Sequence, residues 1–173
     1  MSINQILKSA WSQLQERQQA ILQGRFGVGS YKEAQTLAAL GDKYGITRER
    51  VRQIESVALG ALRDVLKKDD DANRLKDHAR KIVKEHGGMV SSEHLLKELK
   101  REVKDLTANS LRLLVRAFNV LHFKRADVDF VEGYVLDKTT LKEIKAHAKA
   151  LTSALSKKKK EVLTGAYKKT LES

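Results

Sequence analysis

The sequence predicts a mainly α-helical protein made of two small modules and a C-terminal helix. Three observations support this fold class. Apolar residues recur every three or four positions along most of the chain, which is the period of one buried helical face. Proline is absent, so the 10 glycines and the polar turns must separate the helices. One stretch, residues 120–136, is instead rich in β-branched and aromatic residues, as short strands are.

The first module, residues 1–68, is predicted to contain four helices. Their apolar positions each form one face, and polar or glycine-containing segments separate them. At 68 residues, the module is also long enough to bury a small core of its own. The predicted helices cover residues 3–14, 17–25, 37–44 and 48–68.

The third and fourth of these helices have the pattern of a helix-turn-helix. Gly45 stands where the turn needs a residue that accepts a positive φ, and the small Gly41 lets the two helices approach closely. Thr36 and Thr47 precede the helices as predicted N-caps. The predicted inward-facing positions are Leu40, Tyr44, Ile46, Val51 and Ile54.

Charged and polar side chains fill the first two turns of the fourth helix, the part of this motif that enters the DNA major groove. Arginine donates two hydrogen bonds to guanine, glutamine pairs with adenine, and glutamate accepts from the cytosine amino group. Each good pair discriminates between bases by about 1–3 kcal/mol. An alternative interpretation is that these side chains form a solvated helix face. The polar and charged residues of these two turns are Thr47, Arg48, Glu49, Arg50, Arg52 and Gln53.

A polar, acidic run at residues 69–73 predicts a linker to a second module, residues 74–137. Three predicted helices there are followed by a hairpin formed by residues 120–124 and 129–136, which gives a winged-helix-like order. Arg112 and Arg116, four apart on the third of these helices, are candidates for facing DNA, with a solvated helix face as the alternative. Residues 138–173 are predicted to form a basic C-terminal helix or tail.

The charge predicts a polyanionic partner. The formal net charge is +12, and residues 138–173 carry ten lysines against three glutamates. Nucleic acid and an acidic membrane surface both fit such a charge. No stretch reaches the roughly 18–20 apolar residues that span a bilayer, and the N-terminus lacks the pattern of a secretory signal. We therefore expect a cytoplasmic protein and no membrane partner.

Catalytic and cofactor motifs are not found. The chain has no cysteine, and its five histidines lack the spacing of a metal site. The glycines at positions 24–29 lack the Gly-Lys-Ser/Thr ending of a phosphate-binding loop. We therefore predict no enzymatic activity, no metal or other cofactor, and no small-molecule substrate.

The block Thr-Arg-Glu-Arg-Val-Arg-Gln-Ile-Glu at residues 47–55, together with residues 16–28 and the Thr36-Leu37 pair, resembles region 4 of primary-type bacterial sigma factors. The resemblance covers about residues 3–66. It implies a module that reads the minus-thirty-five promoter element in double-stranded DNA. It also implies an apolar surface that binds the flap of the RNA polymerase β subunit.

The resemblance and the helix-turn-helix pattern together predict the site residues. Phosphate contacts set register and supply salt-dependent affinity, whereas base contacts supply sequence choice. For Thr36 helix capping is a second role, compatible with a phosphate contact. For the two arginines of the second helix the alternative is that they are ordinary surface residues. The predicted base contacts are Thr47, Arg48, Glu49, Arg52 and Gln53, and the predicted phosphate contacts are Arg17, Arg25, Thr36 and Arg50.

Residues 74–136 resemble a winged helix of the HARE-HTH class, as in the RNA polymerase delta subunit, through element order and apolar pattern alone. The leading hypothesis is a sequence-specific, sigma-factor-like DNA-binding transcription factor that works with RNA polymerase in initiation. One alternative is a polymerase-binding accessory protein without sequence readout, and another is an architectural protein that binds DNA nonspecifically. Nothing before residue 3 resembles the promoter-melting region 2, so we expect that the chain alone does not open a promoter.

Overall fold

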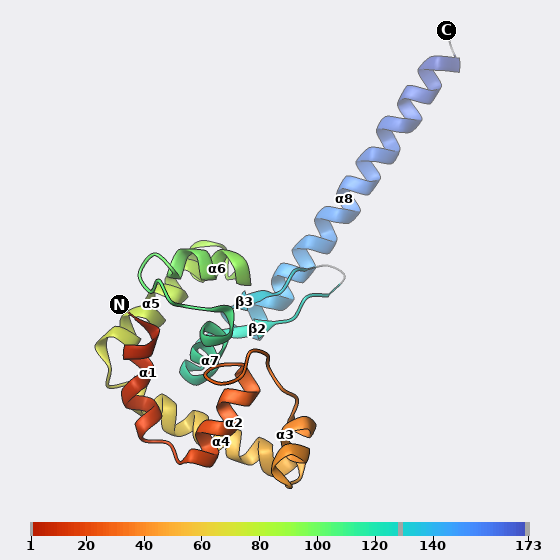
Figure 1. The fold of residues 1–173 in the computed structure, drawn as a ribbon. Helices are drawn as coiled ribbons and strands as arrows, with labels where there is room; N and C mark the ends of the chain where they lie inside the picture. Colours follow the sequence, from red (N-terminus) through yellow and green to blue (C-terminus); the bar gives the residue numbers. More distant parts are fainter. Residues whose placement is uncertain (1, 128–129, 172–173) are drawn as a thin grey trace. The chain divides into compact units, whose positions relative to one another are not determined.

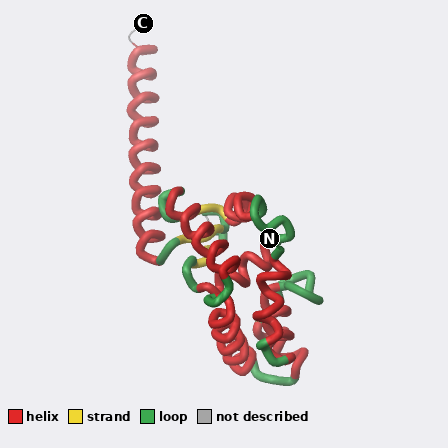
Figure 2. Tube along the Cα trace, turned by 90° about the vertical axis from the view of Figure 1, so that its left-hand side faces the viewer, coloured by secondary structure: helices red, strands yellow, loops and turns green. Residues whose placement is uncertain are grey.

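The computed structural model describes residues 2–127 and 130–171 (Figure 1). Contacts divide the chain into two compact units, Met1–Leu136 and Asp137–Ser173. Helices dominate both units and only short strands occur among the described residues, which confirms the predicted mainly α class (Figure 2).

The first four helices lie close to their predicted positions, and side chains cap three of them. Ser2 caps the first helix and forms a capping box with Gln5. Thr36 and Thr47 cap the third and fourth helices, as predicted. The helices are α1 (Ile3–Ser12), α2 (Glu16–Phe26), α3 (Leu37–Tyr44) and α4 (Arg48–Leu66).

A winged-helix order follows, with one strand that the sequence pattern did not predict. The additional strand, β1, pairs antiparallel with β3, and β3 pairs antiparallel with β2, so the sheet order is β1-β3-β2. Of the predicted strand 129–136, Asp129 lies outside the described residues. The elements are α5 (Asp70–Glu85), β1 (Met89–Ser91), α6 (Ser92–Leu99), α7 (Ala108–Phe118), β2 (His122–Lys124) and β3 (Gly133–Val135).

The prediction of a linker at residues 69–73 is wrong, because these residues begin α5. Asp69 is the N-cap, and its carboxylate accepts a hydrogen bond of 2.8 Å from the amide of Ala72. Asp70 and Asp71 occupy the first turn, where negative charge interacts favourably with the helix dipole. The acidic run that suggested a solvated linker is therefore a helix-start signal.

Helix α7 joins the two predicted modules into one core. It packs against α2 and α4 of the first module and against α6 and β2 of the second (Figure 1). Six of its residues are buried. A single hydrophobic cluster consequently extends from Ile3 in α1 to Tyr134 in β3.

Polar contacts also link the two predicted modules. Asp105 accepts hydrogen bonds from the Ser2 hydroxyl at 2.6 Å and from the Ile3 amide at 2.8 Å. These bonds, the one from Ser2 first, lower the pKa of the Asp105 carboxyl. Asn109 donates to the Gly27 carbonyl at 2.9 Å, which connects α7 to the end of α2. Contacts accordingly place residues 1–136 in one compact unit.

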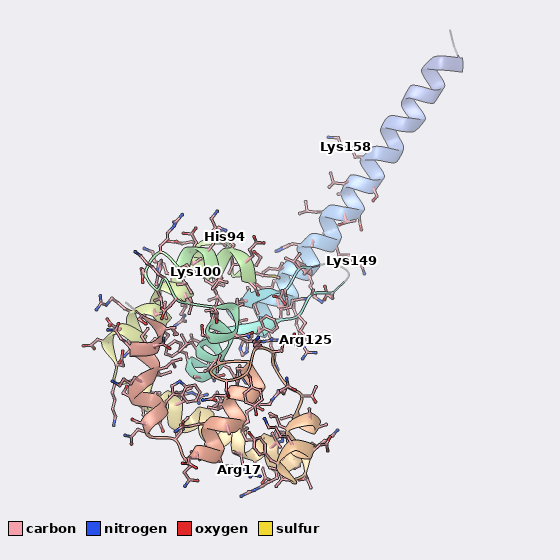
Figure 3. All side chains as sticks on the ribbon, viewed as in Figure 1. Arg17, His94, Lys100, Arg125, Lys149 and Lys158 are labelled. Atoms are coloured by element: carbon pink, nitrogen blue, oxygen red, sulfur yellow. The ribbon has the colours of Figure 1, made fainter. Side chains whose placement is uncertain are left out.

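The second unit contains helix α8 (Lys138–Leu171), in the region where a basic C-terminal helix is predicted. Asp137 supports its start, because its carboxylate accepts a hydrogen bond of 2.8 Å from the Thr140 amide. Lys149 and Lys158 are exposed on this helix (Figure 3). Of the lysine run 157–160, the side chains of Lys159 and Lys160 lie outside the description. Among the described residues, no helix has the length and apolar character needed to cross a membrane.

Candidate nucleic-acid interface

The corner between α3 and α4 has the geometry of a helix-turn-helix. Gly45 adopts the left-handed conformation, with a φ of 63°, and ends α3. A Cβ added to Gly41 would lie 2.6 Å from the carbonyl oxygen of Ile46, so only glycine fits where the two helices meet. A small apolar cluster centred on the buried residues Ile21, Leu40 and Val51 holds the corner together. Both predicted glycine roles are therefore realised in this turn.

The predicted base-reading residues lie in the first two turns of α4, and all of them are exposed. Thr47 begins the helix, because its hydroxyl accepts a hydrogen bond of 3.1 Å from the Arg50 amide. Val51 and the half-buried Ile54 face the small cluster behind them. This inward face fixes how α4 is held, so Arg48, Glu49 and Gln53 lie on the exposed side of the helix.

Two of the predicted readers form an ion pair with each other. The Arg52 Nε and Nη2 atoms donate to both carboxylate oxygens of Glu49 at 2.6–3.1 Å. Hydrogen bonds from Arg52 are the main cause that lowers the pKa of Glu49. The two side chains are 59% and 55% exposed, and exposed pairs of this kind separate readily. Glu49 is thus an ionised acceptor, and the pair does not bury either group.

Another predicted base reader contacts a predicted phosphate-binding residue. The Arg50 Nη1 atom donates to the Gln53 side-chain oxygen at 3.1 Å. Gln53 also hydrogen-bonds to Glu49, which contributes to the lowered pKa of that carboxyl. Since an amide nitrogen carries two hydrogens, Gln53 can still donate to the adenine N7 atom. Both side chains are exposed.

Arg17 and Thr36, two of the predicted phosphate contacts, are exposed near the helix-turn-helix. Arg17 donates to the Tyr44 carbonyl at 3.0 Å, and its guanidinium lies 4.8 Å from the centre of the Tyr44 ring. The Thr36 hydroxyl accepts from the Ala39 amide at 3.1 Å, so capping is one of its roles. Thr36 caps α3 just as Thr47 caps α4.

Arg25 occupies a more enclosed position than the other predicted phosphate contacts. Its Nε atom donates to Glu55 of α4 at 3.1 Å, and Nη1 donates to the carbonyl of Gln35. The side chain of Arg25 is 25% exposed and that of Glu55 is 12% exposed. Two of the three guanidinium nitrogens therefore connect α2 to α4 and to the segment before α3.

The stretch that builds this corner also matches a known family. Residues 2–64 match the family Sigma-70, region 4. A relative from Helicobacter pylori, RNA polymerase sigma factor RpoD, is 44% identical over 57 residues, which are 33% of this chain and 8% of that protein. RNA polymerase sigma factor SigA4 from Synechococcus elongatus is 46% identical over 56 residues, which are 32% of this chain and 18% of that protein. The chain therefore spans less than a fifth of the length of either relative.

The match supports the predicted resemblance to region 4, and the matched part is hereafter the region 4 module. It ends two residues before the end of α4. The structure places α5 and the rest of the winged-helix elements after this boundary, within the same compact unit. The region 4 module is therefore physically continuous with elements that the family match does not cover.

One cluster in the region 4 module was not predicted from the sequence. Lys43 donates to the Tyr31 hydroxyl at 2.6 Å, and the Tyr31 and Tyr44 hydroxyls are 3.1 Å apart. The hydrogen bond from Lys43 lowers the pKa of Tyr31, whereas the hydrogen bond with Tyr31 raises the pKa of Tyr44. The cluster fixes the segment before α3 against the end of α3. The aromatic residue at position 31, inside a polar segment, was the only sequence signal for it.

Proposed function

We propose that this protein is a sequence-specific DNA-binding transcription factor, without enzymatic activity, that recognises a promoter element in double-stranded DNA. The observation that carries this proposal is the exposed, capped start of α4 within the region 4 module. Base contacts are assigned to Thr47, Arg48, Glu49, Arg52 and Gln53. Phosphate contacts are assigned to Arg17, Arg25, Thr36 and Arg50.

The charge around α4 supports a DNA partner. Arg17, Arg48 and Arg50 are exposed at or beside the same corner, and each can approach a phosphate or a base edge. Arg25 is assigned a supporting role as well, because its bonds to Glu55 and Gln35 hold α2 and α4 in place. A ligand as polyanionic as DNA also fits a net charge of +12.

The proposed setting is transcription initiation, with the core RNA polymerase as a second partner. Both relatives named above are RNA polymerase sigma factors, and the shared part is the region 4 module. We assign the β flap as the docking point on the polymerase, because the resemblance to region 4 implies it. We further propose that residues 1–68 supply DNA recognition and that residues 74–137 are a second functional module, even though the two share a core.

The decisive experiment is an unbiased selection of DNA bound by the full chain, with and without core RNA polymerase. Enrichment of one motif by the chain alone supports sequence readout. Enrichment only in the presence of polymerase supports a joint complex. No enrichment under either condition would overturn the proposal.

Replacing Arg48 or Gln53 with alanine should relax the choice of base at one position of the selected site. Each variant should lose about 1–3 kcal/mol of discrimination at that position while retaining most of its affinity for unrelated DNA. Competition binding with single-base variants of the site measures this effect. Lys8→Ala, on the exposed face of α1, removes a charge outside the corner and serves as a control. Full selectivity in both alanine variants would show that other residues read the bases.

A second candidate function is that of a polymerase-binding accessory protein without sequence readout. The ion pair between Glu49 and Arg52 favours it, because these two groups would have to separate before either could contact a base. A pull-down with core polymerase, combined with DNA titrations, separates the two candidates. Tight polymerase binding together with equal affinity for all DNA sequences would favour the accessory role.

A further inference from the structure

A groove of about 330 Å³ lies between α4 and the C-terminal end of α7. Both helices belong to the same compact unit, so the structure defines the groove. It combines residues of the region 4 module with residues that the family match does not cover. The groove is lined by Arg52, Glu55, Ser56, Leu59, Gly60 and Arg63 of α4 and by Arg116 and Asn119 at the end of α7.

The groove is positively charged. Three arginines line it, against a single glutamate, and that glutamate is already paired with Arg25. The Arg63 Nε atom donates to the Ala117 carbonyl at 2.6 Å. This bond satisfies one of the last carbonyls of α7, which reduces the negative potential expected at a helix C-terminus. An anion in the groove would therefore meet Arg116 directly, whereas Arg52 would first have to separate from Glu49, an exposed pair of the kind that separates readily.

The middle of the groove is open to a large ligand. Nothing lies within 4 Å of the position that a Cβ of Gly60 would occupy. Arg116 and Asn119 are exposed at the α7 side. The groove thus has room for an extended polyanion such as a nucleic-acid backbone.

The groove begins at the proposed base-reading site. Arg52 precedes Gln53 in the second turn of α4, and the groove then follows α4 to Arg63, a distance of about 16 Å along the helix axis. A helix that inserts its first two turns into the DNA major groove has sugar–phosphate backbones beside its next turns, because the major groove is only about 12 Å wide. The protein groove between α4 and α7 therefore lies where a flanking DNA backbone would pass.

We propose that this groove binds the phosphates of the DNA strand that flanks the bases read by α4. Arg116, from outside the region 4 module, supplies a phosphate contact, and Asn119 lies beside it. The proposal rests on the proposed function and extends the DNA interface onto α7. It also gives the winged-helix elements a role in DNA binding. This role does not require α7 to enter a groove of the DNA, since α2, α4, α6 and β2 pack against that helix.

Arg112, the other sequence candidate on α7, is not part of this contact. Its guanidinium lies 4.2 Å from the centre of the Phe123 ring in β2 and does not line the groove. Arg112 thus packs inside the winged-helix elements, whereas Arg116 faces α4. The four-residue spacing that suggested one shared DNA-facing surface leads to two different environments.

The test is a salt-dependent DNA titration with the full chain and its Arg116 variants, on a selected site and on an unrelated duplex. Arg116→Ala should weaken binding roughly three- to tenfold on both duplexes and lower the slope of log K against log salt by about one. Arg116→Lys should retain most of the slope, because it keeps the charge. Arg80→Ala, on the exposed face of α5 and outside the groove, removes an equal charge and should have little effect.

The outcomes separate this proposal from the proposed function. A wild-type chain that prefers its selected site, with Arg116→Ala matching Arg80→Ala in slope and affinity, would overturn the groove alone. A slope change for Arg116→Ala with no preferred site would support the groove and overturn sequence readout. No DNA binding by the wild-type chain would overturn both. We expect Arg116→Ala to fold, because the Arg116 side chain is exposed. An unchanged thermal unfolding transition would verify this.

Discussion

Leu95→Ala in α6 should shift the unfolding transition seen at Trp11 in α1 to a lower urea concentration. Leu95 is fully buried, and truncating such a leucine costs about 2–5 kcal/mol through lost burial and the cavity left behind. Trp11 is the single tryptophan of the chain, and it packs against the same hydrophobic cluster from the first module. Because one core joins the two predicted modules, we expect damage in the second to be reported by fluorescence in the first.

Leu155→Ala is the matched control for this experiment. It makes the same chemical change on α8, where the side chain is 66% exposed, and it should leave the Trp11 transition within about 0.5 kcal/mol of the wild type. An unshifted Trp11 midpoint in Leu95→Ala, with the second module destabilised by another probe, would show that residues 1–68 unfold independently. In that case the acidic run at residues 69–73 would act as a boundary after all.

Gly41→Val should destabilise the corner between α3 and α4 and strongly weaken DNA binding. A Cβ at this position would lie 2.6 Å from the Ile46 carbonyl oxygen, a backbone atom that cannot move without displacing the turn. Overpacking of this kind costs about 1–3 kcal/mol. A displaced turn would also change the angle at which α4 presents Arg48 and Gln53. Urea unfolding measures the first effect, and titration with a selected DNA site measures the second.

Gly60→Val provides the control for the unfolding measurement, since it makes the same substitution within α4. Nothing lies within 4 Å of its added Cβ, and helix propensity favours valine slightly over glycine, so the free energy of unfolding should change by less than about 0.5 kcal/mol. If Gly41→Val is as stable as Gly60→Val and binds a selected DNA site as tightly as the wild-type chain, close helix approach at Gly41 is not needed for this corner.

The sequence predicted the helix-turn-helix well because its signals are local. A capping threonine, a turn glycine and a three-to-four-residue apolar period each act within a few residues of their own position. Thr36, Gly45 and Thr47 accordingly have their predicted backbone roles. The exposure of the first two turns of α4 also followed from this periodicity.

The strand β1 and the start of α5 were not predicted, each for a different reason. Three residues, Met89–Ser91, are too few to show an alternating pattern, and their strand exists only because Tyr134 and its neighbours in β3 pair with them. The run beginning at Asp69 was misread because aspartates suit both a solvated linker and a helix start. The hydrogen bond that the Asp69 carboxylate accepts from the Ala72 amide decided between these two possibilities.

By itself, the sequence determined the kinds of element and the chemistry of the exposed start of α4, since both depend on neighbouring residues along the chain. Only the tertiary structure decided that the two modules share one core and that Arg116 faces α4. It likewise decided that Arg25 bonds to Glu55 and Gln35. These outcomes depend on contacts between residues that are far apart in the chain, such as Arg63 with Ala117. Such contacts form when complete helices pack together. A local sequence pattern does not indicate which apolar face will pack against which other face.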